Sequence, residues 1–259
     1  MSELVLIEPD AYGTKGVVGL TLNRPDAFNA LSEAMLEALD RALQDIAESD
    51  ARVVVLAGAG RAFCAGHDIK EMRAEPALDY YRALFARCSH MMLTLQRMPQ
   101  PVIARVHGIA AAAGCQLVAM CDLAVASSDA RFAVSGVNLG LFCATPGVAL
   151  SRNVSRKAAF EMLMTGEFID AATARERGLV NRVASPDALD DAVRSLAATI
   201  AAKPREAVAA GKGLFYRQLE SGIEDAYALA SETMACNMME DATLEGTQAF
   251  VEKRPPRWD

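Results

Sequence analysis

The chain has 259 residues and a mass of 27.6 kDa, so it can bury a large apolar core without disulfide or metal staples. Its composition, 52% hydrophobic and 23% charged, is that of a globular protein and excludes disordered, collagen-like and mucin-like classes. The 26 Lys and Arg against 33 Asp and Glu give a net charge of −7, which excludes a broadly basic, nucleic-acid-binding protein.

Cysteine and histidine usage argues against a metal centre. The six cysteines have no CxxC spacing and only three histidines are present, so no structural zinc site is expected. The N-terminus lacks the pattern of a signal peptide, and no apolar run approaches the roughly 18 residues of a membrane span. We therefore expect a soluble, cytoplasmic protein with free thiols that binds neither membranes nor nucleic acid.

Strand and helix patterns alternate through the first part of the chain. Period-two and continuous apolar runs predict strands, and apolar residues at helical spacing predict helices. Asn29 or Ser32 is the expected cap of the first helix. The predicted elements are a hairpin of residues 4–8 and 17–23, a helix ending near residue 46, a strand at 53–57, a loop at 58–69, a helix at 78–98 and a strand at 102–106.

The second part continues this pattern and then becomes mostly helical. The alternation predicts an α/β fold with crossover connections. We place a boundary near residue 200, which gives an α/β core over 1–200 and a helical region over 201–259. The predicted elements are a turn at 108–114, a helix from 116, strands at 123–127, 131–134 and 179–184, and helices at 155–165, 170–177, 186–202, 204–219 and 223–253.

Two loops directly follow predicted buried strands, at residues 62–68 and 107–114. Open α/β sheets bind ligands at the carboxyl ends of their strands. Small residues let a ligand approach the backbone, and the second loop leads into a helix whose first N–H groups are free. One N–H group from each loop can hold a developing oxyanion. The alternative is that these are tight turns with a purely structural role.

Four segments carry a resemblance to a known family: AFCAGHDIKEM at 62–72, PVIARVHGIAAAAGCQLVAMCDLAVAS at 101–127, TGEFIDAATARERGLVNRV at 165–183 and AFVEKRPPRW at 249–258. In this order and spacing they resemble the crotonase superfamily, also called the enoyl-CoA hydratase/isomerase family. Through VNLGLFCATPGVALSR at 137–152, the chain is most similar to the enoyl-CoA hydratase domain-containing protein 3 group.

The resemblance implies a fold, an assembly and a class of activity. The fold would be a crotonase-like spiral of ββα units followed by a C-terminal helical trimerisation region. The protein would form a homotrimer or a dimer of trimers. It would act as a lyase-class enzyme of fatty acid metabolism on acyl-CoA thioesters. Coenzyme A belongs to the substrate in this family, so no separate cofactor is expected.

The resemblance also implies the roles of particular residues. Family members stabilise a thioester enolate with two backbone N–H groups, which match His67 and Ala113 here. Lys70 would reach the phosphates of coenzyme A. Residues near the nucleotide often come from a neighbouring subunit. The positions matching the family's CoA-binding residues are Ala65, His67, Asp68, Ile69, Lys70, Phe250 and Lys253.

The sequence departs from the family at the residues that activate water. Family hydratases use two glutamates, and the matching positions here are Gln116 and Gly136. Glutamine can orient a water but cannot accept its proton, and glycine has no side chain. We therefore expect a retained oxyanion hole and weak hydratase activity.

Several side chains keep two interpretations. The His67 ring either acts as a general acid or shapes its loop; methylmalonyl-CoA decarboxylases of the superfamily also have His at this place. Cys143 stands where those decarboxylases have Tyr, and is either a proton donor or inert packing. Asp68 is interpreted as a cap rather than a base. Gln116 either holds a water or satisfies a backbone group.

Two classes of function follow from these residues. The first is an acyl-CoA enzyme that stabilises an enolate, as a decarboxylase, thioester hydrolase, isomerase or inefficient hydratase. The second is a non-catalytic protein that binds CoA thioesters. A Rossmann-type nucleotide binder is excluded because no GxGxxG motif follows a strand.

Overall fold

A computed structural model describes residues 3–74 and 76–258. Met1, Ser2, Glu75 and Asp259 belong to the expected ranges 1–200 and 201–259 but lie outside the described residues. None of the helices in the described part of the chain combines the length and apolar character needed to cross a bilayer.

The main sheet has six strands in the order β1-β2-β3-β4-β6-β9. The first two strands form the predicted antiparallel hairpin, and every other pair is parallel, as their continuous apolar runs indicate. The strands are β1 (Val5–Glu8), β2 (Val17–Leu22), β3 (Val53–Gly58), β4 (Val102–Val106), β6 (Leu123–Ser127) and β9 (Arg182–Ala184).

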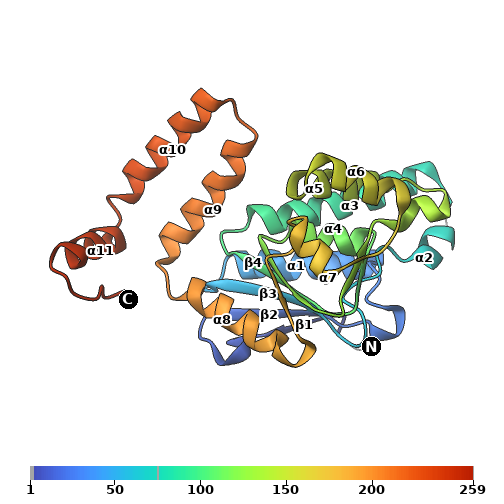
Figure 1. The fold of residues 1–259 in the computed structure, drawn as a ribbon, viewed down its shortest axis with the longest axis horizontal. Helices are drawn as coiled ribbons and strands as arrows, with labels where there is room; N and C mark the ends of the chain where they lie inside the picture. Colours follow the sequence, from blue (N-terminus) through green and yellow to red (C-terminus); the bar gives the residue numbers. More distant parts are fainter. Residues whose placement is uncertain (1–2, 75, 259) are drawn as a thin grey trace.

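Both faces of this sheet are covered by helices (Figure 1). Alternate residues such as Leu56 and Val106 face α1 (Glu33–Ala47), α3 (Leu78–Arg97) and α4 (Ala113–Met120) in the larger apolar core. The intervening residues pack on α8 (Leu189–Ala201) in a second, smaller core. Each fully buried aliphatic side chain contributes about 1.5–3 kcal/mol to folding. Because β2, β3, β4, β6 and β9 run parallel, their carboxyl ends lie along the same edge of the sheet.

A small sheet and several short elements complete the core. The small sheet has the order β5-β7-β8. Its strands are β5 (Ile109–Ala111), β7 (Arg131–Ala133) and β8 (Ile169–Asp170), with helices α2 (Ile69–Ala74), α5 (Ala144–Asn153), α6 (Arg156–Thr165) and α7 (Ala171–Glu176) nearby. Short 3-10 turns cover Ala11–Gly13, Pro25–Ala27, Ser135–Leu139 and Pro186–Ala188.

The structure corrects two local predictions and decides between the two expected caps of α1. Residues 109–111 form a strand rather than part of a turn because they pair with β7. Helix α5 was not among the predicted elements; its Pro146 lies in the first helical turn, where no N–H is needed. Ser32 caps α1, with its Oγ accepting from the Met35 N–H at 3.2 Å, and Asn29 does not.

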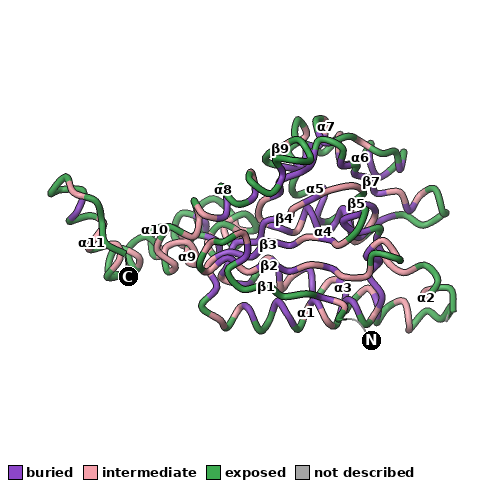
Figure 2. Tube along the Cα trace, turned by 90° about the horizontal axis from the view of Figure 1, so that it is seen from below, coloured by how far each residue is buried: buried purple, intermediate pink, exposed green. Residues whose placement is uncertain are grey.

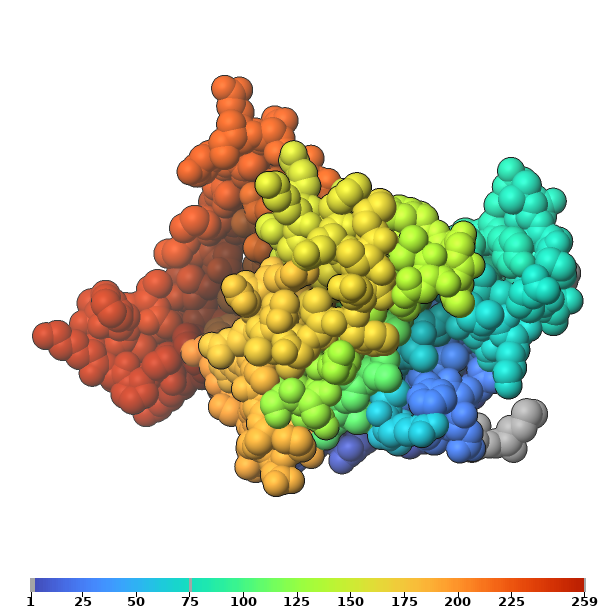
Figure 3. All heavy atoms as spheres, turned by 45° about the vertical axis from the view of Figure 1, so that its right-hand side comes forward, coloured from blue at the N-terminus to red at the C-terminus, as the bar shows by residue number. Residues whose placement is uncertain are grey.

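The chain ends in an arm of three helices, α9 (Arg205–Leu219), α10 (Ile223–Asn237) and α11 (Asp241–Val251). We call residues 205–258 the C-terminal arm. Helix α9 contacts the α/β part, whereas α10 and α11 stand away from it at one edge (Figures 1 and 3), and most of the arm's surface is exposed (Figure 2). The helix predicted over 223–253 is broken before α11, where Glu240 adopts an extended backbone. No Gly or Pro marks this break in the sequence.

Candidate functional site

The two loops singled out in the sequence are joined by backbone hydrogen bonds. The Cys64 N–H donates to the Ile109 carbonyl at 3.1 Å, and the Ala111 N–H donates to the Cys64 carbonyl at 2.9 Å. The first loop thereby forms a parallel bridge to β5. These bonds fix the path of both loops at the carboxyl edge of the main sheet.

Two glycines allow the loops to touch. A Cβ atom on Gly114 would lie 2.0 Å from the Cys64 carbonyl oxygen, which no side chain tolerates. A Cβ atom on Gly66, whose φ is +97°, would lie 3.3 Å from the Ala113 nitrogen. Because Gly66 directly precedes His67, the structure brings the backbone of His67 close to that of Ala113. Only small residues permit this approach.

The N–H groups of His67 and Ala113 have no acceptor among the described residues. Ala113 opens α4, so its N–H is one of the free donors of a helix N-terminus. The preceding residue, Ala112, has φ 49° and ψ −116°, an unusual conformation for a residue with a side chain. Its own N–H donates to the Ala133 carbonyl at 2.8 Å. Local strain held by surrounding packing is common at functional sites.

Asn29 holds the first loop through side-chain hydrogen bonds to its backbone. Its backbone is left-handed, with φ 54°, and its side chain is buried. The Nδ2 group donates to the carbonyls of Ala59 at 2.9 Å and Ala62 at 2.8 Å, and the Oδ1 atom accepts from the Arg24 N–H at 2.9 Å. Sequence analysis considered Asn29 only as a helix cap and missed this role. A signal was available, since Asn is favoured at left-handed positions.

The His67 ring is packed rather than hydrogen bonded. It contacts Phe85 edge-on, with ring centroids 5.5 Å apart, and neither ring nitrogen has a hydrogen-bond partner among the described residues. Burial lowers the pKa of His67 below its usual 6.5, and the nearby Leu31 backbone opposes this shift without meeting hydrogen-bond geometry. A neutral ring at pH 7 favours loop shaping over a general acid.

Asp68 caps the short helix α2. Its Oδ2 atom pairs with Arg24 at 2.7 Å, and Oδ1 accepts from the N–H groups of Lys70 and Glu71. Partial burial raises the pKa of Asp68, but these hydrogen bonds and the Arg24 charge outweigh it and lower the pKa overall. A carboxylate held in this way is a weak base, which supports the predicted capping role.

The expected CoA-binding positions fall into two groups. Ala65, Ile69 and Lys70 lie on or directly after the first loop, and the last two are exposed. Phe250, 85% exposed, and Lys253 lie at the end of the arm. Figure 1 shows α11 and α2 at opposite ends of the molecule. One chain therefore does not bring the two groups together.

The positions of the missing glutamates are Gln116 and Gly136. We call these two residues, together with Leu141 and Cys143 that contact Gly136, the wall of the site. Gln116, on α4, is 5% exposed, and its Oε1 atom has no partner among the described residues. The Gly136 N–H donates to the Cys143 Sγ atom at 3.2 Å. A Cβ atom at Gly136 would lie 2.4 Å from the Leu141 carbonyl oxygen and 2.7 Å from that sulfur. The space for a side chain at residue 136 is therefore already filled.

Cys143 is a buried, protonated thiol. Burial raises its pKa, and the hydrogen bond from Gly136 opposes the shift. The neighbouring Cys115 has its pKa raised to about 12 by burial, with a smaller contribution from Cys143. Neither thiol is a nucleophile at neutral pH. Over residues 3–74 and 76–258, no group of three or more His, Cys, Asp and Glu side chains is placed to hold a metal ion.

A buried ion pair, which the sequence did not predict, holds α9 on the core. The Lys212 Nζ group donates to Asp122 Oδ2 at 2.7 Å and to the carbonyls of Leu95 and Gln100, both at 2.8 Å. The Tyr216 hydroxyl donates to the other Asp122 oxygen at 2.8 Å. Burial lowers the pKa of Lys212, and the Asp122 charge opposes that shift. The available signal was a lysine among Gly, Ala and Leu residues of α9.

Comparisons with known proteins agree with the resemblance seen in the sequence. Residues 13–259 match the family model for enoyl-CoA hydratase/isomerase. A crystal structure of an enoyl-CoA hydratase from Mycobacterium smegmatis is 66% identical, with a TM-score of 0.97 and 99% of each chain covered. The human enoyl-CoA hydratase domain-containing protein 3 structure is 42% identical, with a TM-score of 0.94, covering 98% of this chain and 100% of that one. These likenesses confirm the predicted crotonase-like fold and similarity group.

The comparisons also correct one prediction. The Xenopus laevis protein named enoyl-CoA hydratase domain-containing protein 3, mitochondrial, is 45% identical over 94% of this chain and 83% of its own length. Rat, mouse and human relatives at 44–45% identity also carry the designation mitochondrial. The expected cytoplasmic location is therefore wrong. Composition and net charge report on solubility and do not encode a compartment.

Proposed function

The chain belongs to the enoyl-CoA hydratase/isomerase family, and we propose that it binds acyl-CoA thioesters and stabilises the thioester enolate with two backbone N–H groups. The donors are those of His67 and Ala113. The observation that carries the proposal is that both N–H groups lack an acceptor within loops locked together by hydrogen bonds. Fixed backbone donors need no reorganisation during the reaction, and one such donor contributes about 10²–10³ in rate.

Gln116 and Gly136, at the positions of the two expected glutamates, make the protein a poor hydratase. Hydration requires a base for the water proton and an acid for the α-carbon. Gln116 accepts no proton, and the contacts around Gly136 leave no room for a second carboxylate. Each general acid–base step contributes about 10²–10⁴ in rate, and both contributions are missing.

Coenzyme A would lie along the first loop, where Ala65, His67, Asp68, Ile69 and Lys70 line its path and Lys70 meets its phosphates. Phe250 and Lys253 can join this site only from a neighbouring subunit, because α11 lies far from the loops of its own chain (Figure 1). The nucleotide end of the ligand would then be shared between two copies. Coenzyme A is part of the substrate, so no separate cofactor enters the proposal.

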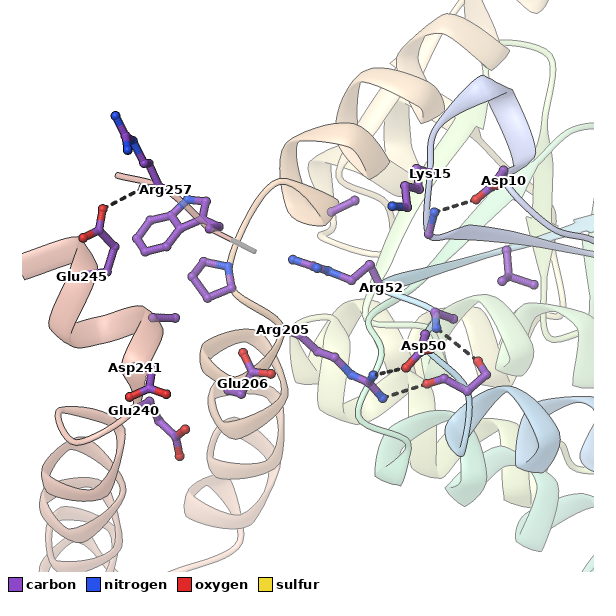
Figure 4. A pocket seen from close by; sticks show the side chains of 18 of the residues that line it. Asp10, Lys15, Asp50, Arg52, Arg205, Glu206, Glu240, Asp241, Glu245 and Arg257 are labelled. Carbon is purple, nitrogen blue, oxygen red and sulfur yellow. Dashed lines mark hydrogen bonds and ion pairs between the residues drawn. The ribbon is translucent and has the colours of Figure 1, made fainter. Parts of the chain in front are cut away.

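The C-terminal arm would form the contacts with other copies of the chain. A cleft of about 1610 Å³ separates it from the core. Figure 4 shows charged residues of both signs on each side, with Glu240, Glu245 and Arg257 on the arm and Asp10, Lys15, Asp50 and Arg52 on the core. A closed ring joins two different surface patches of each copy, and a projecting arm offers one of them. The proposed assembly is a homotrimer or a dimer of trimers through residues 201–259. Large exposed apolar side chains of the arm include Leu219, Ile223, Tyr227, Met234, Phe250 and Val251.

Decarboxylation is the second candidate for the reaction, with thioester hydrolysis as a further alternative. Loss of CO₂ from an acyl-CoA with a carboxylate on its α-carbon breaks a C–C bond and leaves its electron pair as the enolate. No enzymic base is needed for that step. The observation that favours it is the thiol of Cys143 beside Gly136, which burial keeps protonated and which would be the proton donor to the α-carbon.

Infrared spectroscopy of a bound thioester tests the oxyanion hole without assuming a reaction. The thioester carbonyl of isotope-labelled butyryl-CoA should absorb at lower frequency when bound to the full-length protein. Ala113→Pro removes one donor and should abolish much of the shift, and circular dichroism checks that the variant still folds. Ala113→Gly keeps the N–H and serves as the control. Binding without any shift would indicate a non-catalytic CoA-thioester-binding protein instead.

A further inference from the structure

A groove of about 730 Å³ runs between helices α3, α4, α5 and α9. Its inner end holds Gln116, whose Oε1 atom is buried and has no partner among the described residues. Along α3, the lining residues Ser89, Met92 and Gln96 follow one another at helical spacing. One turn before Ser89 on that face lies Phe85, which contacts His67. The groove therefore continues from the two loops along α3.

The middle of the groove is apolar. Met92 and Leu93 of α3, Met120 of α4 and Val148 and Ala149 of α5 supply its walls. A surface of this kind favours an aliphatic chain, because each buried methylene contributes about 0.8 kcal/mol. The flexible methionine side chains adapt to the shape of such a chain.

The outer end of the groove is positively charged. Arg97, Arg152 and Arg217 line it, together with one acidic residue, Glu220. Glu220 pairs with Arg152 at 3.1 Å. Neither Arg97 nor Arg217 has a carboxylate partner among the described residues. Two guanidinium groups, neither of them in an ion pair among the described residues, therefore stand at the end of an apolar groove.

We propose that this groove receives the acyl chain and that the substrate carries a second carboxylate at the end remote from coenzyme A. The inference rests on the proposed acyl-CoA function and names its substrate class. A terminal carboxylate would accept charge-assisted hydrogen bonds from Arg97 and Arg217, in the fork geometry that guanidinium groups offer. A methyl terminus would place apolar surface against two hydrated cations and gain nothing from them.

The length of the groove sets the length of the chain. Ser89 and Arg97 are eight residues apart on α3, which corresponds to about 12 Å of helix rise. An extended alkyl chain advances about 1.3 Å per C–C bond, so roughly nine bonds span this distance. The preferred substrate class is therefore an acyl-CoA of about ten carbons with a carboxylate at both original ends, such as decanedioyl-CoA.

Calorimetry with the full-length protein in its native assembly tests the proposal with butyryl-CoA, decanoyl-CoA and decanedioyl-CoA. Hydrogen bonds to charged groups predict that decanedioyl-CoA binds about tenfold to a hundredfold more tightly than decanoyl-CoA. The double variant Arg97→Gln and Arg217→Gln should reduce that ratio to about twofold or less. Arg194→Gln, on α8 across the sheet, is the matched control and should keep the full ratio. Val148→Trp should weaken both ten-carbon ligands by obstructing the groove.

The outcomes separate the two proposals. Equal binding of decanoyl-CoA and decanedioyl-CoA, or tighter binding of the former, overturns the dicarboxylate inference and leaves the proposed function standing. A preference for decanedioyl-CoA that survives the double arginine variant overturns the assignment to this groove. Absence of binding by all three thioesters contradicts the proposed function and the inference together.

Discussion

The two loops and the wall differ in which groups they offer to a ligand. The loops offer backbone N–H groups, whereas the wall has the side chain of Gln116 and a filled space at Gly136. The loops are held by hydrogen bonds and by glycines with no room for a Cβ atom, so their donors are fixed by packing. On the wall, Gln116 keeps its place with an unpaired oxygen, while the space beside Gly136 is filled by Leu141 and Cys143. The proposed oxyanion donors thus depend on backbone packing, whereas residues 116 and 136 carry no carboxylate.

The largest effect should come from forcing the loops apart. Gly114→Ala places a methyl group on the Cys64 carbonyl oxygen, so the backbone must shift and the Ala113 donor with it. We expect about a 10²–10³-fold loss in any enolate-forming reaction. Gly211→Ala in α9, where a Cβ atom meets nothing within 4 Å, is the control and should be stabilising or neutral. Equal activity of the two variants would refute the packing argument.

The second largest effect should come from the ion pair between Lys212 and Asp122, which holds α9 on the core. Lys212→Met leaves the carboxylate buried without its cation, which should lower the free energy of unfolding by about 3–5 kcal/mol. Chemical denaturation followed by circular dichroism measures the loss. Adding Asp122→Asn should recover part of it by removing the uncompensated charge. If the single variant is as stable as the wild type, the ion pair does not hold α9.

A smaller loss should follow from adding one methyl group to the wall. Gly136→Ala overlaps the Leu141 carbonyl and the Cys143 sulfur, and overpacking of this kind costs about 1–3 kcal/mol. Cys143→Ala in the same chain should relieve only the sulfur overlap, so the double variant should be intermediate. Differential scanning calorimetry provides the comparison. Tolerance of Gly136→Ala without any cost would mean that the wall still has space for a side chain.

The smallest expected effect is a pH dependence from His67. Burial lowers its pKa, so below pH 6.5 the unfolded chain binds a proton that the folded chain does not. Stability should therefore fall as pH drops below 6.5, by at most about 1.4 kcal/mol per pH unit for one proton. His67→Gln should remove this slope in urea unfolding between pH 5.5 and 7.5, whereas His90→Gln, at an exposed position, should keep it. An unchanged slope in His67→Gln would assign the dependence to another group.

The sequence was sufficient for the features that rest on local patterns. Three such features could be predicted because each depends on neighbours in the chain. They are the apolar runs of the strands, the Ser32 cap and the two small-residue loops after β3 and β4. The pairing of Lys212 with Asp122 joins residues 90 positions apart, and the filling of Gly136 depends on how residues 137–143 fold back. Such features arise from tertiary packing, which no local pattern encodes.

The steady-state rate of crotonyl-CoA hydration tests most directly the claim that the site keeps its oxyanion donors and lacks its acid and base. The account predicts a kcat/KM several orders of magnitude below the diffusional ceiling of about 10⁸–10⁹ M⁻¹s⁻¹. It also predicts a rise in Gln116→Glu, because a carboxylate there restores one proton acceptor. A wild-type kcat/KM of about 10⁷ M⁻¹s⁻¹ would contradict it.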